Sequence, residues 1–474
     1  MTTYVPSCAI ALGLFPRFLG AVYLLAFVSL LVQADGLYGS RGILPIRDYV
    51  AALREHLGVK GWRRFPSIFW LNSGDSFVTG CAALGVGLSF LLVLGITPLP
   101  LLVILWLIYL SFSTMGQEFL SYQWDALLLE TGFMTMFLPL ATPASPLVCL
   151  AYHFFVFRFI LSAGVVKLTS RDPNWRNLLA LSFHYETQPI PNRVAWYAHQ
   201  LPQQLQRLST LGTFFFELIV PFLALGPAPL RLACFCLLLS FQVLIMLTGN
   251  YGFFNCLTIV LCVPLLDDRY LGAIGQAPVL SVPAADTAFA APLIGAVFLL
   301  FLLLNVAQLI RLFVRPYWLN RLLVTFGRLW VSNPYGLFAV MTTERYEFEI
   351  QGSNDLKGWQ VYEFRWKPGD PAIAPRQAAP HQPRLDWQMW FAALNPSFVE
   401  PWLESLVRRL LEGSPPVLAL FRTVPFREAP PTFIRLVVYR YHFSDLSTKK
   451  SSGRWWNRRE IGASAPMTLR GRHG

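Results

Sequence analysis

Long apolar runs separated by short polar connections fill the chain from about residue 16 to residue 313. A membrane-spanning helix needs about 20 predominantly apolar residues. Nine runs approach that length, and they cover residues 16–33, 77–96, 98–114, 125–141, 146–168, 210–226, 229–248, 253–266 and 290–313. The run at 125–141 is compatible with a re-entrant segment, and the run at 253–266 is short. The pattern therefore predicts an α-helical multi-pass membrane bundle of seven to nine spans within residues 1–320.

The connections between these runs are unequal in length. If all nine runs cross the membrane, the long polar loops 34–76 and 169–209 and the whole region after Phe313 lie on one side, which we call the loop-rich face. The opposite face keeps mainly tight turns, such as Gly226-Pro227. This asymmetry indicates that the loop-rich face carries the function.

From about residue 325 the apolar runs give way to alternating charged and apolar residues, which is typical of strands with one solvated face. We expect a C-terminal β-rich α+β domain at 325–445. Its expected elements are a hairpin from the runs at 345–350 and 359–366, helices at 386–394 and 399–412, and a strand at 432–443.

Two further segments flank this domain. The connection before it has little Gly or Ser, so we expect the domain to pack on the bundle through Trp330, Tyr335 and Phe338 rather than to move on a free tether. The segment 446–474 carries seven Lys or Arg residues against Glu460 alone, which predicts a basic, disordered tail.

Composition narrows the class of protein. Hydrophobic residues make up 55% of the chain and charged residues only 14%, whereas soluble domains carry about 25% charged residues. A soluble enzyme is therefore excluded. The net charge of +12 would suggest nucleic acid as the partner of a soluble protein, but in a membrane protein basic loops report topology and contacts with lipid headgroups.

Short catalytic motifs are absent from the sequence. It contains no nucleophile elbow, P-loop, dinucleotide fingerprint or HExxH sequence, and its seven cysteines form no CxxC or zinc-type pair. We therefore assign no catalytic residue, no cofactor and no metal site.

Ionisable residues inside or beside the apolar runs are the most informative chemical signal. Each costs roughly 2.5–3.5 kcal/mol to insert and is usually kept for pairing or function. Arg158 has only apolar neighbours, so we expect it to face the bundle and to pair with Glu130 or Glu217. Nine residues separate it from Lys167, which places the two cations on opposite sides of one helix. The predicted intramembrane polar site comprises Asp125, Glu130, Arg158, Lys167 and Glu217.

The polar site has two interpretations. Buried ion pairs that fix the arrangement of helices are the simpler one, and a role in ligand handling or proton transfer is the alternative. Loop 169–209 mixes charges with aromatic residues, and we predict that Arg171, Trp175, His184 and Tyr185 form a client-binding face. Aromatic residues at the level of the lipid headgroups would give the same pattern without any client.

Several strings together resemble the lipase maturation factors, in order from about residue 20 to residue 445. They are GLYGSRGILP at 36–45, QEFLSYQWDALLLETG at 117–132, KLTSRDPNW at 167–175, HYETQP at 184–189, LTGNYGFFN at 247–255, NPYGLF at 333–338, and the stretch 345–359. The resemblance implies a multi-pass membrane protein with a chaperone-like role, which helps a secreted lipase client reach its folded and assembled state.

The resemblance also implies a location. In animals this maturation takes place at the endoplasmic reticulum, with the loops and the C-terminal domain thought to face the lumen. Loop 34–76 carries six basic residues, Arg41, Arg47, Arg54, Lys60, Arg63 and Arg64, which by the positive-inside rule favours the cytoplasm instead. We follow the resemblance. No usable N-glycosylation site and no KDEL-type ending is present, which suggests a bacterial relative. We expect the inner membrane for a bacterial protein and the endoplasmic reticulum membrane for a eukaryotic one.

Two other functions remain open from the sequence. The intramembrane Lys and carboxylates look loosely similar to the membrane domain of vitamin K-dependent carboxylases, in which case Lys167 would be a base in a membrane enzyme. A transporter could instead pass a lipid-like anion beside Arg158 and Lys167, although the chain has no inverted repeat.

Overall fold

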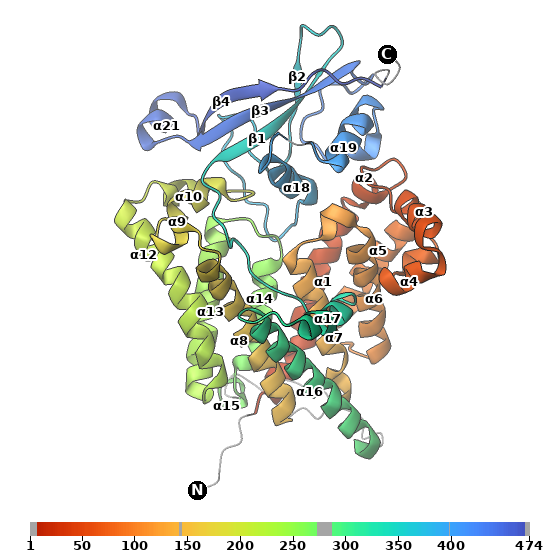
Figure 1. The fold of residues 1–474 in the computed structure, drawn as a ribbon, viewed down its shortest axis with the longest axis vertical. Helices are drawn as coiled ribbons and strands as arrows, with labels where there is room; N and C mark the ends of the chain where they lie inside the picture. Colours follow the sequence, from red (N-terminus) through yellow and green to blue (C-terminus); the bar gives the residue numbers. More distant parts are fainter. Residues whose placement is uncertain (1–6, 142–144, 273–286, 398, 470–474) are drawn as a thin grey trace.

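A helical bundle and a smaller sheet-containing domain stacked on one end of it make up the computed structural model of the chain (Figure 1). The structure describes residues 7–141, 145–272, 287–397 and 399–469. The first described helix begins at the end of the bundle that is remote from the sheet (Figure 1).

Each of the nine predicted apolar runs forms a helix in the described part of the chain. Six helical segments are long and apolar enough to cross a membrane, and two more apolar helices are shorter, which identifies an integral membrane protein. α7 has 14 residues and is buried along most of its length, so it is an interior helix of the bundle. The helices are α1 (Ala9–Leu31), α5 (Asp75–Val93), α6 (Leu99–Met115), α7 (Gln123–Met136), α8 (Pro146–Thr169), α12 (Gln203–Phe214), α13 (Ala228–Thr248), α14 (Phe254–Cys262) and α16 (Thr287–Arg311).

The span that begins with α12 changes its helical type part of the way along. It widens into a π turn, η5 (Phe215–Ile219), and then tightens into a 3₁₀ segment, η6 (Val220–Leu225). Pro221 explains the change, because proline has no N–H to donate and its ring clashes with the carbonyl four residues earlier, here that of Glu217. Glu217 therefore lies in the irregular turn.

Short helices cover the end of the bundle next to the sheet (Figure 1). They come from the two long loops, 34–76 and 169–209. The first loop forms α2 (Ala34–Tyr38), α3 (Ile46–Leu57), η1 (Gly58–Lys60), α4 (Gly61–Arg64) and η2 (Ile68–Trp70), and the second forms α9 (Pro173–Arg176), α10 (Ala180–Thr187) and α11 (Arg193–His199). Shorter connecting elements elsewhere in the bundle are η3 (Gln117–Leu120), η4 (Leu138–Leu140), η7 (Val263–Leu265) and α15 (Asp268–Leu271).

The C-terminal domain contains one antiparallel sheet with the strand order β2-β1-β3-β4. β1 and β2 form the predicted hairpin, and β3 begins within one residue of the predicted strand, so these expectations are confirmed. The predicted helices at 386–394 and 399–412 are also confirmed. The elements are β1 (Arg345–Ser353), β2 (Gln360–Tyr362), α18 (Arg384–Ala393), α19 (Pro401–Leu411), α20 (Pro415–Leu418) and β3 (Phe433–Phe443).

The expected disordered tail is wrong for residues 446–469. They form α21 (Leu446–Ser452) and β4 (Trp456–Ala463), and β4 pairs with β3 at the edge of the sheet. The ring of Trp456 stacks on Phe443 with 4.2 Å between their centroids, and Arg458 reaches Glu349 at 2.5 Å. These distant partners order a segment whose own composition favours disorder, while residues 470–474 lie outside the described part.

A strap at residues 328–344 joins α17 (Tyr317–Gly327) to the sheet and runs along the bundle (Figure 1). Tyr335 is buried in it and packs edge-on against Phe159 of α8. Phe338 packs against His184, and Trp330 contacts the main core. The predicted packing through these three aromatic residues is confirmed.

A disulfide joins Cys8, which precedes α1, to Cys149 in the first turn of α8. It lies at the end of the bundle that is remote from the sheet. The two cysteines are 141 residues apart, so local sequence spacing gave no signal for the pair.

Candidate functional site

The junction between the bundle and the C-terminal domain contains a buried ion pair. Asp125 of α7 receives two hydrogen bonds from Arg384 of α18, at 2.9 and 3.0 Å, and both side chains are fully buried. The Tyr109 hydroxyl donates to the same carboxylate at 2.5 Å. Because Arg384 lies in a polar part of the sequence, nothing there marked it as the counter-ion of an intramembrane residue.

Arg158 pairs with Glu130, which is one of the two partners predicted for it. Nη2 of Arg158 lies 2.5 Å from Oε1 of Glu130, and both side chains are 1% exposed. The strap completes the site: the backbone N–H and side-chain amide of Asn333 and the hydroxyl of Tyr335 all donate to the other Glu130 oxygen, Oε2, within 3.0 Å. Arg158 in turn donates to the Asn333 carbonyl at 2.7 Å.

Lys167 pairs with Glu217, so each buried cation of α8 has a carboxylate of its own. The Lys167 ammonium donates to Glu217 at 2.8 Å and lies 5.4 Å from the centre of the Trp175 ring. A lysine that acts as an enzymatic base needs an amine that is free to accept a proton. The Lys167 amine is instead engaged by the Glu217 carboxylate. The enzyme and transporter alternatives therefore gain no support from the geometry.

The predicted client-binding face is not a surface. Trp175 is only 2% exposed, and its indole N–H donates to the Phe338 carbonyl of the strap at 2.9 Å. Tyr185 is buried as well, and His184 is largely covered and shares a 2.9 Å hydrogen bond with the Tyr251 hydroxyl. Phe338 of the strap contacts both Trp175 and His184, which the pattern of the sequence could not show. Arg171 alone of the four is exposed.

Arg345 provides a second fastening between the two parts of the chain. This buried side chain donates to the carbonyls of Glu186, Gln188 and Pro189 at 2.9, 2.5 and 2.9 Å, and pairs with Glu347 at 2.5 Å. The Glu186 carboxylate accepts from the Phe443 backbone N–H at 2.9 Å. α10 is thus tied to strands β1 and β3.

Asn250 makes a third connection across the junction. Its side-chain oxygen accepts from the N–H groups of Ala378 and Ala379 at 2.7 and 2.9 Å, and its amide donates to the carbonyls of Ile190 and Arg376. Residues from six of the strings that resemble the lipase maturation factors make these contacts among the bundle, the strap and the C-terminal domain.

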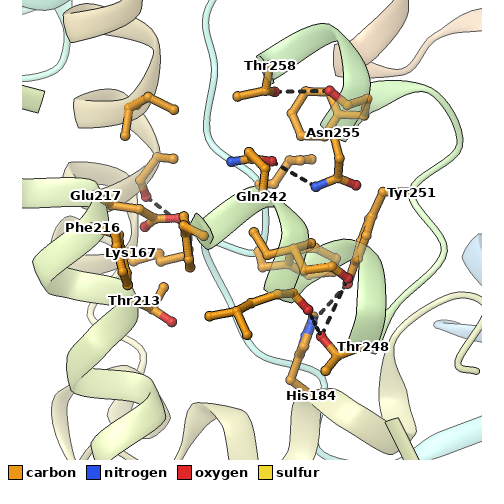
Figure 2. A pocket seen from close by; sticks show the side chains of 18 of the residues that line it. Lys167, His184, Thr213, Phe216, Glu217, Gln242, Thr248, Tyr251, Asn255 and Thr258 are labelled. Carbon is orange, nitrogen blue, oxygen red and sulfur yellow. Dashed lines mark hydrogen bonds and ion pairs between the residues drawn. The ribbon is translucent and has the colours of Figure 1, made fainter. Parts of the chain in front are cut away.

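A cavity of about 340 Å³ lies within the bundle beside the Lys167–Glu217 pair. Figure 2 shows three polar pairs around it: Lys167 with Glu217, Gln242 with Asn255, and His184 with Tyr251. Most of the remaining wall is aromatic or aliphatic, and it includes Trp175 and Tyr185. Burial, aided by the Lys167 ammonium, lowers the pKa of His184 to about 4, so its imidazole is neutral at pH 7.

The described residues contain no group of three or more His, Cys, Asp or Glu side chains that could hold a metal ion. The charged groups of the junction and the cavity instead form ion pairs with one another. The arrangement is suited to holding two domains in a fixed relation and to binding an apolar molecule.

Comparison with known proteins assigns the family. Residues 11–273 match the lipase maturation factor transmembrane domain, and residues 331–466 match the lipase maturation factor C-terminal domain. Lipase maturation factor 2 of Rattus norvegicus is 34% identical over 96% of this chain and 82% of its own length. Lipase maturation factor 1 of Bos taurus is 35% identical over 96% of this chain and 88% of its own length. No solved structure matches the chain. With both domains matched in order, the chain belongs to the lipase maturation factor family.

Proposed function

We propose that this chain is a membrane-bound maturation factor that assists the folding and assembly of secreted lipases. The observation that carries the proposal is the match of both domains to one family, whose curated relatives are named for lipase maturation. The relatives match along nearly the whole chain, so the proposal rests on the full architecture and not on one motif.

The client, in this proposal, binds to a composite surface made by the loop-rich face and the C-terminal domain together. Arg409 of α19 donates to the Gly42 carbonyl at 2.8 Å, and Ser414 donates to the Arg41 carbonyl at 2.6 Å. These contacts hold loop 34–76 against the C-terminal domain, as Arg345 does for loop 169–209. A folding client would therefore meet one rigid body, with exposed basic residues such as Arg171 and Arg176 on it.

The finer location follows from the client. A secreted lipase folds after it has crossed the membrane, so we propose that the loop-rich face meets the periplasm in a bacterial host or the lumen of the endoplasmic reticulum in a eukaryotic one. The bundle then serves as the anchor that keeps the folding surface at the point where the client emerges.

A deletion experiment tests the function. The gene is deleted in its host, and the secreted lipase is measured twice, as enzyme activity and as protein. We expect lipase protein that lacks activity or is degraded before secretion, and we expect the wild-type gene to restore activity. The exposed variant Arg171→Glu, checked for normal level in the membrane, tests the loop-rich face separately. Unchanged specific activity of every secreted lipase in the deletion strain would refute the maturation function.

A further inference from the structure

The cavity beside the Lys167–Glu217 pair has a mostly apolar wall, which reaches the exposed surface of the bundle at Leu244. Its accessible rim is formed by one side of α12 and η5, including Gly212 and Phe216, and by one side of α13, including Phe241 and Leu244. Leu244 is 55% exposed. The neighbouring residues Leu208, Leu211, Val243 and Leu247 on these two helices are exposed and apolar, as lipid-facing residues are.

α12 and α13 are joined through η5, η6 and the turn at Gly226-Pro227. α13 follows η6 through the turn at Gly226-Pro227 and packs along η6 and α14. Nearer the loop-rich face, the irregular turn η5 carries Glu217 on one side of the gap, and α13 carries Gln242 on the other. Glu217 and Gln242 thus line the cavity from the two helices.

Two buried acceptor atoms in the cavity wall have no hydrogen-bond partner among the described residues. They are Oε2 of Glu217 and Oδ1 of Asn255, whose residues are 8% and 1% exposed. Their other polar atoms are engaged, Glu217 by Lys167 and Asn255 by Gln242. Because an unsatisfied buried acceptor is costly, the wall is complementary to a ligand that donates hydrogen bonds.

The charges of the wall select against an ionic ligand. The positive charge of Lys167 is already matched by Glu217 at 2.8 Å, and His184 is neutral at pH 7. An anionic head would have to compete with Glu217 for the ammonium, and a cationic head would face Lys167 itself. A neutral head with hydroxyl or amide donors meets neither cost.

We propose that this cavity binds a single-chain amphiphile with an uncharged, hydrogen-bond-donating head, of the monoacylglycerol type. The head lies between Glu217 and Asn255 and donates to their free oxygens, while the acyl chain lies along the aromatic wall and leaves between α12 and α13. The volume of about 340 Å³ is within the range of small-molecule sites, about 300–1,000 Å³. The proposal is independent of the maturation function.

Native mass spectrometry of the full chain in detergent micelles tests the ligand class. Three compounds with the same oleoyl chain are compared: 1-monooleoylglycerol, methyl oleate, which has no donor, and oleate, which is anionic. We expect one bound monooleoylglycerol at saturation and at least tenfold weaker binding of the other two. Equal binding of all three would overturn the assignment of the head, and the absence of saturable binding would overturn the site.

A substitution that fills the cavity tests its location. Gly212 lines the cavity, and a Cβ added there meets no atom within 4 Å, so Gly212→Phe adds a ring at the cavity wall without a clash at its Cβ. Gly87 of α5 also has open space at its Cβ but lies outside the cavity, so Gly87→Phe is the matched control. We expect Gly212→Phe to weaken monooleoylglycerol binding at least tenfold and Gly87→Phe to change it less than twofold.

Two variants with smaller side chains keep the test valid if Gly212→Phe misfolds. If Gly212→Phe is not recovered in folded form, Gly212→Leu and Ser209→Leu fill the same space from α12 with less bulk. Binding that stays at the wild-type level in folded variants of this set would show that the amphiphile binds elsewhere, and the proposal would fail.

Discussion

The guanidinium of Arg158 and the carboxylate of Glu130 lie 2.5 Å apart in the interior of the bundle, and the strap that leads to the C-terminal domain closes over them through Asn333 and Tyr335. This ion pair thus joins α7, α8 and the strap. Since each member has been removed from water, neither can be lost without stranding the other.

Replacing Arg158 tests this dependence. Arg158→Leu should lower the free energy of unfolding by roughly 3–5 kcal/mol, because it leaves the Glu130 carboxylate buried without a counter-ion. Denaturant unfolding in detergent micelles measures the loss. The double variant Glu130→Gln/Arg158→Leu should recover part of it, because the amide keeps an acceptor for Asn333 and Tyr335 without the charge. The exposed Arg176→Leu is the control, and an equal loss there would contradict the prediction.

The second prediction concerns the edge strand β4. Trp456 is 1% exposed and packs against Tyr441, Phe443 and Trp196, so Trp456→Ala should destabilise the C-terminal domain by about 3–5 kcal/mol. Limited proteolysis should then cleave the domain earlier than in the wild type. Arg459→Ala, at an exposed position on the same strand, should leave the cleavage rate unchanged. A disordered tail would predict no effect from either change.

The pH dependence of stability contains a contribution from His184. Its pKa is lowered from 6.5 to about 4 by burial, so between these values the unfolded chain binds more protons than the folded chain. The contribution of His184 to the free energy of unfolding is present above pH 6.5 and is lost as the pH falls toward 4. On the order of 2 kcal/mol is lost between pH 7 and pH 5.

Variants at two histidines isolate that contribution. Melting temperatures measured from pH 7 to pH 5 should fall less steeply for His184→Gln than for the wild type, since glutamine can still hydrogen-bond to Tyr251 but does not titrate. His56→Gln, at an exposed position on α3, should keep the wild-type slope. A wild-type slope in His184→Gln would show that this imidazole is protonated as easily in the folded protein as in the unfolded one.

The orientation of the chain can be decided with C-terminal fusions. If the loop-rich face meets the secretory side, alkaline phosphatase fused after residue 474 should be active in a bacterial host, and a fluorescent protein that folds only in the cytoplasm should stay dark. The basic residues of loop 34–76 favour the opposite orientation, as does the disulfide Cys8–Cys149 at the other end, because disulfides persist in oxidising compartments. Inactive phosphatase with a fluorescent fusion would place the C-terminal domain in the cytoplasm and remove it from any secreted client.

Local patterns in the sequence predicted the elements well. Apolar runs, alternation and turn residues are properties of neighbouring positions, so the nine helical runs, the hairpin of β1 and β2, and the strand β3 followed from them. The partner of Arg158 could be narrowed to two carboxylates because few charges occur in the apolar runs. In each case the information lies within a short window or within a small set of residues.

Contacts between distant residues could not be read in the same way. Asp125 and Arg384 are 259 residues apart, and Arg384 is an ordinary charged residue in a polar region. Trp175 was interpreted as a surface residue because nothing in its own loop shows that the strap covers it. Strand β4 looked like a basic tail because the partners that order it, Glu349 and Phe443, lie elsewhere in the chain.

The pair of Asp125 and Arg384 has a consequence for biosynthesis. Asp125 precedes its counter-ion by 259 residues, so the bundle is synthesised before α18 can dock and pair with it. A chain truncated before residue 384 leaves Asp125 without Arg384, so we expect such a truncation to destabilise the bundle itself and not merely to remove the C-terminal domain.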